Sequence, residues 1–145
     1  MIKYIIVSNN ITLKDYNDYY FSKYPKRRKK PIEKPYHPSI NKWCILPRPQ
    51  MNKLKQDWKE YTIWLVEQNG FTDLHIEKCR ITYRFYMPSK RRSDTDNYTP
   101  KFCQDGLTEA GVIVDDDYLH CNPLNIWLGY DKDNPRMEII IEEIE

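Results

Sequence analysis

Apolar and polar side chains alternate along residues 75–87, which predicts a β-strand with two different faces. One face is apolar, and the other carries the cations Arg80 and Arg84. Three other stretches are rich in β-branched or other apolar residues, and each predicts a further strand: residues 2–7, 124–130 and 137–144. The polar turn at residues 131–135 predicts that the last two strands form a hairpin.

The stretch from Met51 to Asn69 follows the helical period of 3.6 residues instead. One stripe of this predicted helix consists of Leu54, Trp58, Tyr61, Leu65 and Gln68, with Trp64 beside it. Gly70 is a suitable residue to end the helix, because it adopts the left-handed backbone conformation at low cost. We interpret the stripe as part of the core rather than as a cofactor site.

A shorter helix is predicted between Thr99 and Gly111. Thr99 is its expected N-cap, Pro100 its expected first residue, and Gly111 its expected stop. Together these elements predict an α/β fold in which a small mixed sheet of about four strands packs against two main helices. The length of 145 residues fits a single domain.

Residues 14–37 follow neither period, and we expect a loop or a mobile arm inserted there. Aromatic residues come first: Tyr16, Tyr19, Tyr20, Phe21 and Tyr24. A basic, proline-containing run follows from Lys23 to Pro35. Cations beside aromatic rings suit phosphates and unpaired bases, so we expect five consecutive residues to contact DNA: Lys26, Arg27, Arg28, Lys29 and Lys30. A solvated basic loop beside core tyrosines is the alternative.

Charge is unevenly distributed along the chain. The net charge is only +2, but residues 1–92 carry 20 Lys and Arg against 8 Asp and Glu, whereas residues 93–145 carry 3 against 13. This segregation predicts a basic surface that binds a polyanion and a separate acidic cluster that binds metal ions. Charges scattered over a solvated surface would explain the total but not the segregation.

No apolar run approaches the roughly 20 residues that a membrane-spanning helix needs. The first ten residues lack the apolar length and the cleavage site of a signal peptide. The chain has four cysteines: Cys44, Cys79, Cys103 and Cys121. They form no CxxC pair, and only Cys121 adjoins a histidine. We therefore expect a cytoplasmic protein with reduced thiols and no membrane partner.

Carboxylates gather on both sides of the short predicted helix. Asp94 and Asp96 precede it, and Asp105 lies within it. Three consecutive aspartates follow it: Asp115, Asp116 and Asp117. Alternate residues of an extended chain share a face, so we expect Asp94 and Asp96 to point the same way, and the return strand to bring the second group back to them. Such carboxylates repel one another unless a hard cation neutralises them, which predicts Mg²⁺ or Mn²⁺.

The residues around this helix form a composite motif at residues 88–119. The motif begins with basic residues and Asp-x-Asp-Asn. A helix follows that carries Lys and, four residues later, Asp-x-Leu. Ala-Gly, a short hydrophobic run and Asp-Asp complete the motif. These residues are Arg91, Arg92, Asp94, Asp96, Asn97, Lys101, Asp105, Leu107, Ala110, Gly111, Val112, Ile113, Val114, Asp115 and Asp116. In this motif the chain resembles the RusA-like crossover junction endodeoxyribonucleases.

The resemblance implies a RusA-like fold and a homodimeric, Mg²⁺-dependent enzyme that resolves four-way (Holliday) DNA junctions by paired nicks in recombination and repair. The carboxylates that it implies as catalytic metal ligands are Asp94, Asp96 and Asp116, with Asp115 and Asp117 as alternatives for the third. It implies that Lys101 assists catalysis as a nearby cation. The family usually has three residues between Asp96 and Lys101 where this chain has four, and we expect the loop before the helix to absorb the extra residue.

Further basic residues are expected to position DNA phosphates together with the run from Lys23 to Lys34: Arg80, Arg84, Lys90, Arg91 and Arg92. Two other functions fit the same residues. One is a nuclease that acts on other branched or flapped nucleic acid. The other is a non-catalytic nucleic-acid-binding module whose aspartates hold a structural cation. Lys101 distinguishes these possibilities, because a structural cation site has no need for a positive side chain among its ligands.

Overall fold

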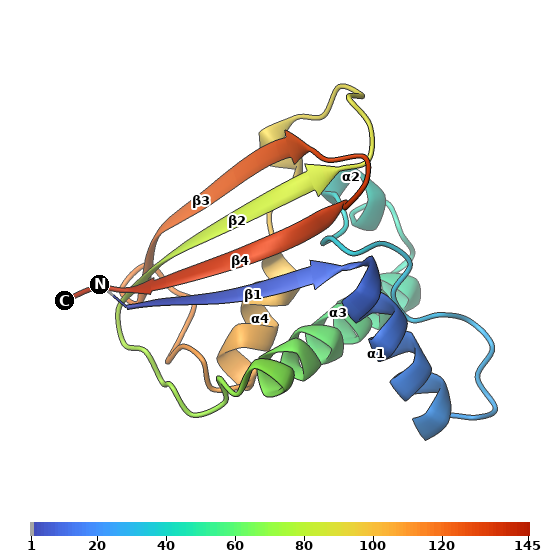
Figure 1. Ribbon diagram of the computed structural model, residues 1–145, viewed down its shortest axis with the longest axis horizontal. Helices are drawn as coiled ribbons and strands as arrows, with labels where there is room; N and C mark the ends of the chain where they lie inside the picture. Colours follow the sequence, from blue (N-terminus) through green and yellow to red (C-terminus); the bar gives the residue numbers. More distant parts are fainter. Residues whose placement is uncertain (1) are drawn as a thin grey trace.

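The computed structural model describes residues 2–145, and Figure 1 labels its helices and strands. In chain order the elements are β1 (Lys3–Asn9), α1 (Asn10–Lys23), α2 (Ile40–Trp43), α3 (Arg48–Asn69), β2 (Cys79–Met87), the 3₁₀ turn η1 (Thr95–Asn97), α4 (Lys101–Glu109), β3 (Cys121–Tyr130) and β4 (Arg136–Glu143). Within residues 2–145, every helix is too short or too polar to serve as a transmembrane span.

The four strands form one mixed sheet in the order β1-β4-β2-β3. β2 runs parallel to β3, and β4 runs antiparallel to both β1 and β2. The predicted mixed sheet is confirmed, whereas the predicted hairpin of β3 and β4 is wrong because β2 lies between them. One face of β2 is entirely buried, so pairing along both of its edges removes much apolar surface from water. The largely exposed β3 lies at the edge.

One face of the sheet packs against α3 and α4, and this interface forms the core (Figure 1). Its buried side chains include Ile6, Ile81, Tyr83, Phe85, Ile139 and Ile141 from the strands and Trp58, Tyr61, Leu65, Phe102 and Leu107 from the helices. The helix predicted from Met51 to Asn69 is confirmed as α3, which begins at Arg48. α4 approaches α3 so closely at Gly106 that a Cβ atom there would lie 2.7 Å from the Thr62 Cβ.

The expectation of a loop throughout residues 14–37 is wrong for its first part, which belongs to α1. The Asn9 side chain accepts hydrogen bonds from the backbone N–H groups of Ile11 and Thr12, at 3.0 and 2.9 Å. The Thr12 hydroxyl in turn accepts one from the Asn9 N–H, which completes a capping box. The buried positions on α1 repeat with helical spacing: Leu13, Tyr16, Asn17 and Tyr20.

Candidate functional site

Asp94 and Asp96 lie in the exposed connection between β2 and α4. Asp94 has an extended backbone, and its carbonyl oxygen accepts a hydrogen bond from the Asn97 N–H at 3.0 Å. Asp96 lies within η1, so the chain turns between the two carboxylates. This turn corrects the expectation that they alternate along an extended segment. The Arg92 guanidinium lies 3.5 Å from the Asp94 carboxylate, and both side chains are largely exposed.

The end of η1 is attached to the rest of the molecule. The Asn97 side-chain oxygen accepts a hydrogen bond from the Asn41 backbone N–H at 3.0 Å. The ring of Tyr98 packs against Phe85 of β2, with 5.3 Å between the ring centroids. Two neighbouring residues therefore hold the turn with Asp94 and Asp96 against the sheet and against the segment that precedes α3.

α4 begins at Lys101, one residue later than predicted, with Pro100 rather than Thr99 as its N-cap. All four residues between Asp96 and Lys101 precede the helix. The Lys101 side chain is exposed, and it makes no ion pair with any of residues 2–145. The structure thus places this cation at the start of the helix, away from direct carboxylate contact.

His37 fixes the start of α4. Its fully buried ring packs against Trp58 and Phe102. Nε2 accepts a hydrogen bond from the Phe102 backbone N–H at 3.0 Å, and Nδ1 donates to the Pro38 carbonyl oxygen at 2.8 Å. Burial lowers the pKa of His37 to about 4, so the ring is neutral near pH 7. His37 therefore links the basic run to the helix that carries Lys101.

A second acidic group lies around the residues that follow α4. The Asp115 carboxylate accepts a hydrogen bond from the Asp116 backbone N–H at 2.7 Å. Partial removal from solvent raises the pKa of Asp116, and the carboxylates of Asp115 and Asp105 raise it further. Asp105 of α4 therefore faces the same region. Mutual repulsion of this kind is what a hard divalent cation relieves.

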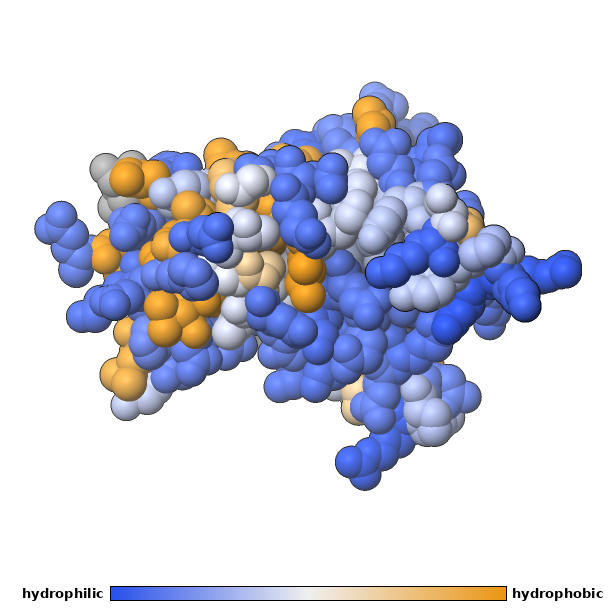
Figure 2. All heavy atoms as spheres, turned by 90° about the horizontal axis from the view of Figure 1, so that it is seen from below, coloured by the Kyte–Doolittle hydropathy of each residue, from blue (hydrophilic) through white to orange (hydrophobic). Residues whose placement is uncertain are grey.

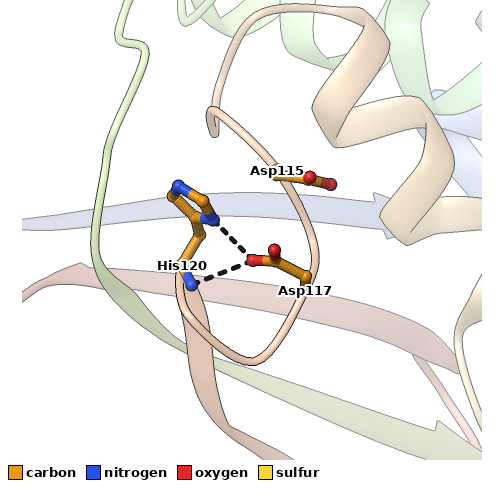
Figure 3. Close-up of side chains that lie close together, drawn as sticks. All are labelled: Asp115, Asp117 and His120. Carbon is orange, nitrogen blue, oxygen red and sulfur yellow. Dashed lines mark hydrogen bonds and ion pairs between the residues drawn. The ribbon is translucent and has the colours of Figure 1, made fainter.

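The Asp117 side chain is bonded to His120, whereas the nearby Asp115 side chain is not (Figure 3). The Asp117 carboxylate accepts hydrogen bonds from the His120 ring Nδ1 at 2.5 Å and from the His120 backbone N–H at 3.2 Å. The hydrogen bond to His120 lowers the pKa of Asp117 and raises that of His120. The Asp117 carbonyl oxygen also accepts from the Cys121 N–H at 2.8 Å. Asp117 thus holds the turn that leads into β3.

The two acidic groups do not meet at one ion. Within residues 2–145, one group of three potential ligands has atoms that all lie within 4.8 Å of one another: Asp115, Asp117 and His120. The set of Asp94, Asp96 and Asp116 does not satisfy that distance. Asp94 and Asp96 lie in the loop that follows the end of β2, whereas Asp116 lies in the loop that leads into the start of β3. Because β2 and β3 are parallel, these two loops lie at opposite ends of the strand pair (Figure 1). This arrangement corrects the expectation that the return strand brings the second group back to the first.

A groove of about 660 Å³, here called the basic groove, lies between α3 and the loop that follows α1. Four of the five consecutive cations predicted to contact DNA line it: Arg27, Arg28, Lys29 and Lys30. Figure 2 shows strongly hydrophilic side chains projecting from this end of the molecule, while apolar atoms gather toward the other end. Tyr98, the residue that follows η1, also lines the groove.

The loop that forms one wall of the basic groove is anchored, so the structure agrees with the first of the two expectations, a loop or a mobile arm. Ile32 is fully buried, and its carbonyl oxygen accepts a hydrogen bond from the Asn17 side chain at 3.2 Å. His37, further along the loop, is bonded to α4. The cations between Lys26 and Lys34 therefore project from a backbone that is fixed on both sides.

The other predicted DNA contacts differ in accessibility. The Arg80 guanidinium lies 2.8 Å from the Glu142 carboxylate on β4, so its charge is largely neutralised. Arg84 is exposed on the face of β2 that points away from the core. The loop after β2 exposes three more cations: Lys90, Arg91 and Arg92. Arg84 and these loop residues are accessible to a polyanion.

The site contains two residues to which the sequence pattern assigned no role: His37 and His120. Asp105 was already part of the predicted carboxylate cluster, and it lies four residues after Lys101, one helical turn further along. His37 and His120 carried no signal in the sequence, because their roles depend on contacts made in the folded chain. Comparison with protein-family models and with curated protein sequences found no match for this chain.

Proposed function

We propose that the chain is a Mg²⁺-dependent, structure-selective endodeoxyribonuclease that acts on branched DNA, with the four-way junction as its expected substrate. One observation supports this most directly: Tyr98, which lines the basic groove, directly follows the turn that carries Asp94 and Asp96. A DNA strand held by the cations of the groove would therefore pass carboxylates that suit a metal ion. Metal-dependent phosphodiester hydrolysis uses phosphate-binding cations beside metal-binding carboxylates.

The donor atoms near the groove suit Mg²⁺ or Mn²⁺. Asp94 and Asp96 offer exposed carboxylate oxygens, which are the ligands that hard divalent cations prefer and that leave room for bound water. A bound ion of this kind supplies a water of lowered pKa and neutralises charge on the phosphate. The proposal assigns the ion to Asp94 and Asp96 alone, because Asp116 and its alternative Asp115 lie at the opposite end of the sheet in this chain.

Within the C-terminal acidic group, Asp117 is less available to a cation than Asp116. The Asp117 carboxylate is occupied by two hydrogen bonds from His120. Asp116 instead has a raised pKa and lies near Asp105 and Asp115. In the proposal, Lys101 supplies positive charge near the phosphate, and a second copy of the chain supplies the equivalent site for the opposed strand of a junction.

A second candidate function is a non-catalytic module that binds branched or single-stranded DNA. The separation of Asp94 and Asp96 from Asp116 favours it, because nucleic-acid binding needs the basic groove but no shared metal site. The absence of an ion pair between Lys101 and any carboxylate in residues 2–145 also suits this candidate. The two candidates differ in one measurable property, which is metal-dependent cleavage.

The test is incubation of the purified protein with a labelled synthetic four-way junction and Mg²⁺ or Mn²⁺, beside linear duplex and a Y-shaped fork. Paired symmetric nicks on the junction are the expected result. Binding without cutting in either metal would replace the proposal with the non-catalytic candidate. Cutting of the fork as efficiently as the junction would indicate a nuclease with a wider range of branched substrates.

Variants at the carboxylates make the test specific. Loss of a residue that only hydrogen-bonds a metal ligand lowers activity roughly 10- to 100-fold. Asp94→Asn and Asp96→Asn change the ligands themselves, so each should lower the cleavage rate by more than that. Junction binding should remain or become tighter, because each change removes a charge that repels phosphate. Asp133→Asn, at an exposed carboxylate in the turn between β3 and β4, is the matched control and should cleave normally. Loss of binding in parallel with cleavage would contradict the metal-ligand assignment.

A further inference from the structure

The basic groove carries more positive charge than its own side chains neutralise. Seven Lys or Arg residues and two carboxylates line it. One of those carboxylates, Asp57, already forms an ion pair with Lys53 at 2.9 Å. Five of the lining cations are exposed and make no ion pair within residues 2–145: Arg28, Lys29, Lys30, Lys34 and Lys42. An anionic ligand would therefore find several unpaired cations along one groove, from the loop after α1 and from α2.

Aromatic side chains line the same groove. Tyr36 and Tyr98 are both half-buried, and they lie close enough that Tyr98 contributes to the raised pKa of Tyr36, after burial itself. Trp58 lies deeper and is 3% exposed. A site for a simple inorganic anion needs cations and N–H groups but gains nothing from rings. Rings beside cations instead suit a ligand with both a charged group and a flat apolar face.

The size of the groove narrows the choice further. Its volume of about 660 Å³ falls inside the range of about 300–1,000 Å³ that is typical of small-ligand pockets, which suits one or two nucleotides. Bases within a duplex are stacked on one another and offer no free face to an aromatic side chain, so a ligand that uses the rings must be unpaired. The anchoring of the loop at Ile32 and His37 means that these side chains project from an ordered wall.

From these features we propose that the basic groove binds an unpaired nucleotide of a DNA strand, with phosphates on its exposed cations and a base against Tyr36 and Tyr98. This inference rests on the proposed function in one respect, which is that the strand is part of branched DNA. It adds that the preferred substrate has unpaired nucleotides beside the branch point. The strand then runs from the groove past Tyr98 to the turn with Asp94 and Asp96.

The test measures binding in EDTA, so that it is independent of cleavage. Fluorescence anisotropy gives the dissociation constants for a labelled eight-nucleotide oligothymidine, for a duplex of equal charge, and for four-way junctions with and without a short single-stranded gap. The single strand and the gapped junction should bind more tightly than the duplex and the fully paired junction. Equal affinity for duplex and single strand would overturn the inference.

Two groove variants and two controls locate the binding. Tyr36→Leu should weaken binding to oligothymidine about tenfold, since a stacked base contributes roughly that much or more. Tyr19 of α1 is 42% exposed and lies outside the groove, so Tyr19→Leu should leave binding to oligothymidine unchanged. The double variant Lys30→Gln/Lys34→Gln should make the slope of log K against log salt concentration less steep by about 1.4. That change corresponds to two lost contacts with single-strand phosphates. The matched double variant Lys78→Gln/Lys132→Gln, at exposed cations outside the groove, should keep the full slope.

Competition distinguishes the nucleotide from its phosphate alone. Thymidine monophosphate should displace the labelled oligonucleotide at concentrations at which inorganic phosphate does not. Equal displacement by the two would identify an anion site without base recognition and would overturn the inference, as would equal losses in the groove and control variants. A junction that is bound through the groove but never cleaved would refute the proposed nuclease and leave this inference intact.

Discussion

Replacement of His37 tests whether the start of α4 depends on a neutral buried imidazole. Burial lowers the pKa of His37 from its ordinary value of 6.5 to about 4. Between these two values the unfolded chain binds a proton that the folded chain does not, so stability is present above pH 6.5 and falls as the pH decreases. At pH 5 the linkage relation gives a loss of about 2 kcal/mol from this residue alone. His37→Gln removes the titrating group and keeps a side chain that can accept the Phe102 hydrogen bond.

The assay is urea denaturation of the parent and of His37→Gln at several pH values from 7.5 to 5. As the pH falls from 7.5 to 5, the unfolding free energy of the parent should decrease by about 2 kcal/mol more than that of the variant. His75→Asn is the control, because His75 is 64% exposed and asparagine tolerates its positive φ of 45°. Parallel pH curves for the parent and His37→Gln would refute the account of a neutral, buried His37.

Two other predictions concern the packing of the helices and the turn before β3. Gly106→Ala should lower the unfolding free energy by about 1–3 kcal/mol in urea denaturation, because the new Cβ would lie 2.7 Å from the Thr62 Cβ; an unchanged midpoint would mean that α3 and α4 can separate at little cost. His120→Gln should lower the melting temperature more at pH 5.5 than at pH 8.5. The hydrogen bond to Asp117 raises the pKa of His120, so its contribution is fully present below pH 6.5 and is lost as the pH rises through the raised value. Equal losses at both pH values would show that protonation of His120 is irrelevant to the turn.

Local periodicity predicted most of the elements that form the core. The alternation along residues 75–87 and the helical stripe of residues 51–69 identified β2 and α3, with their buried faces. α1 was missed because its polar and aromatic residues do not separate clearly into two faces. Its start was nevertheless encoded locally, in the Asn9 and Thr12 capping box. Attention to capping residues would have found this helix without tertiary information.

The candidate site was predictable only in part. The acidic residues, the basic run and the loop before α4 are all visible in the sequence, because residue type and spacing are local properties. The sequence did not reveal that the turn at η1 separates Asp94 from Asp96, or that Asp117 is occupied by His120. Both depend on backbone dihedral angles and on competition for hydrogen bonds, which an alternating pattern does not describe.

The sequence by itself determined the class of the fold, the inward faces of β2 and α3, and the segregation of cations from carboxylates. The faces of β2 and α3 are visible because side chains on one buried face recur every second residue in a strand and every 3.6 residues in a helix. Only the tertiary structure decided the strand order, the anchoring of the basic run and the distance between the acidic groups. Those features depend on contacts between distant residues, such as the hydrogen bond from Phe102 to His37 across 65 positions of the chain. Which of many possible long-range contacts forms is decided by how the whole core packs, not by local pattern.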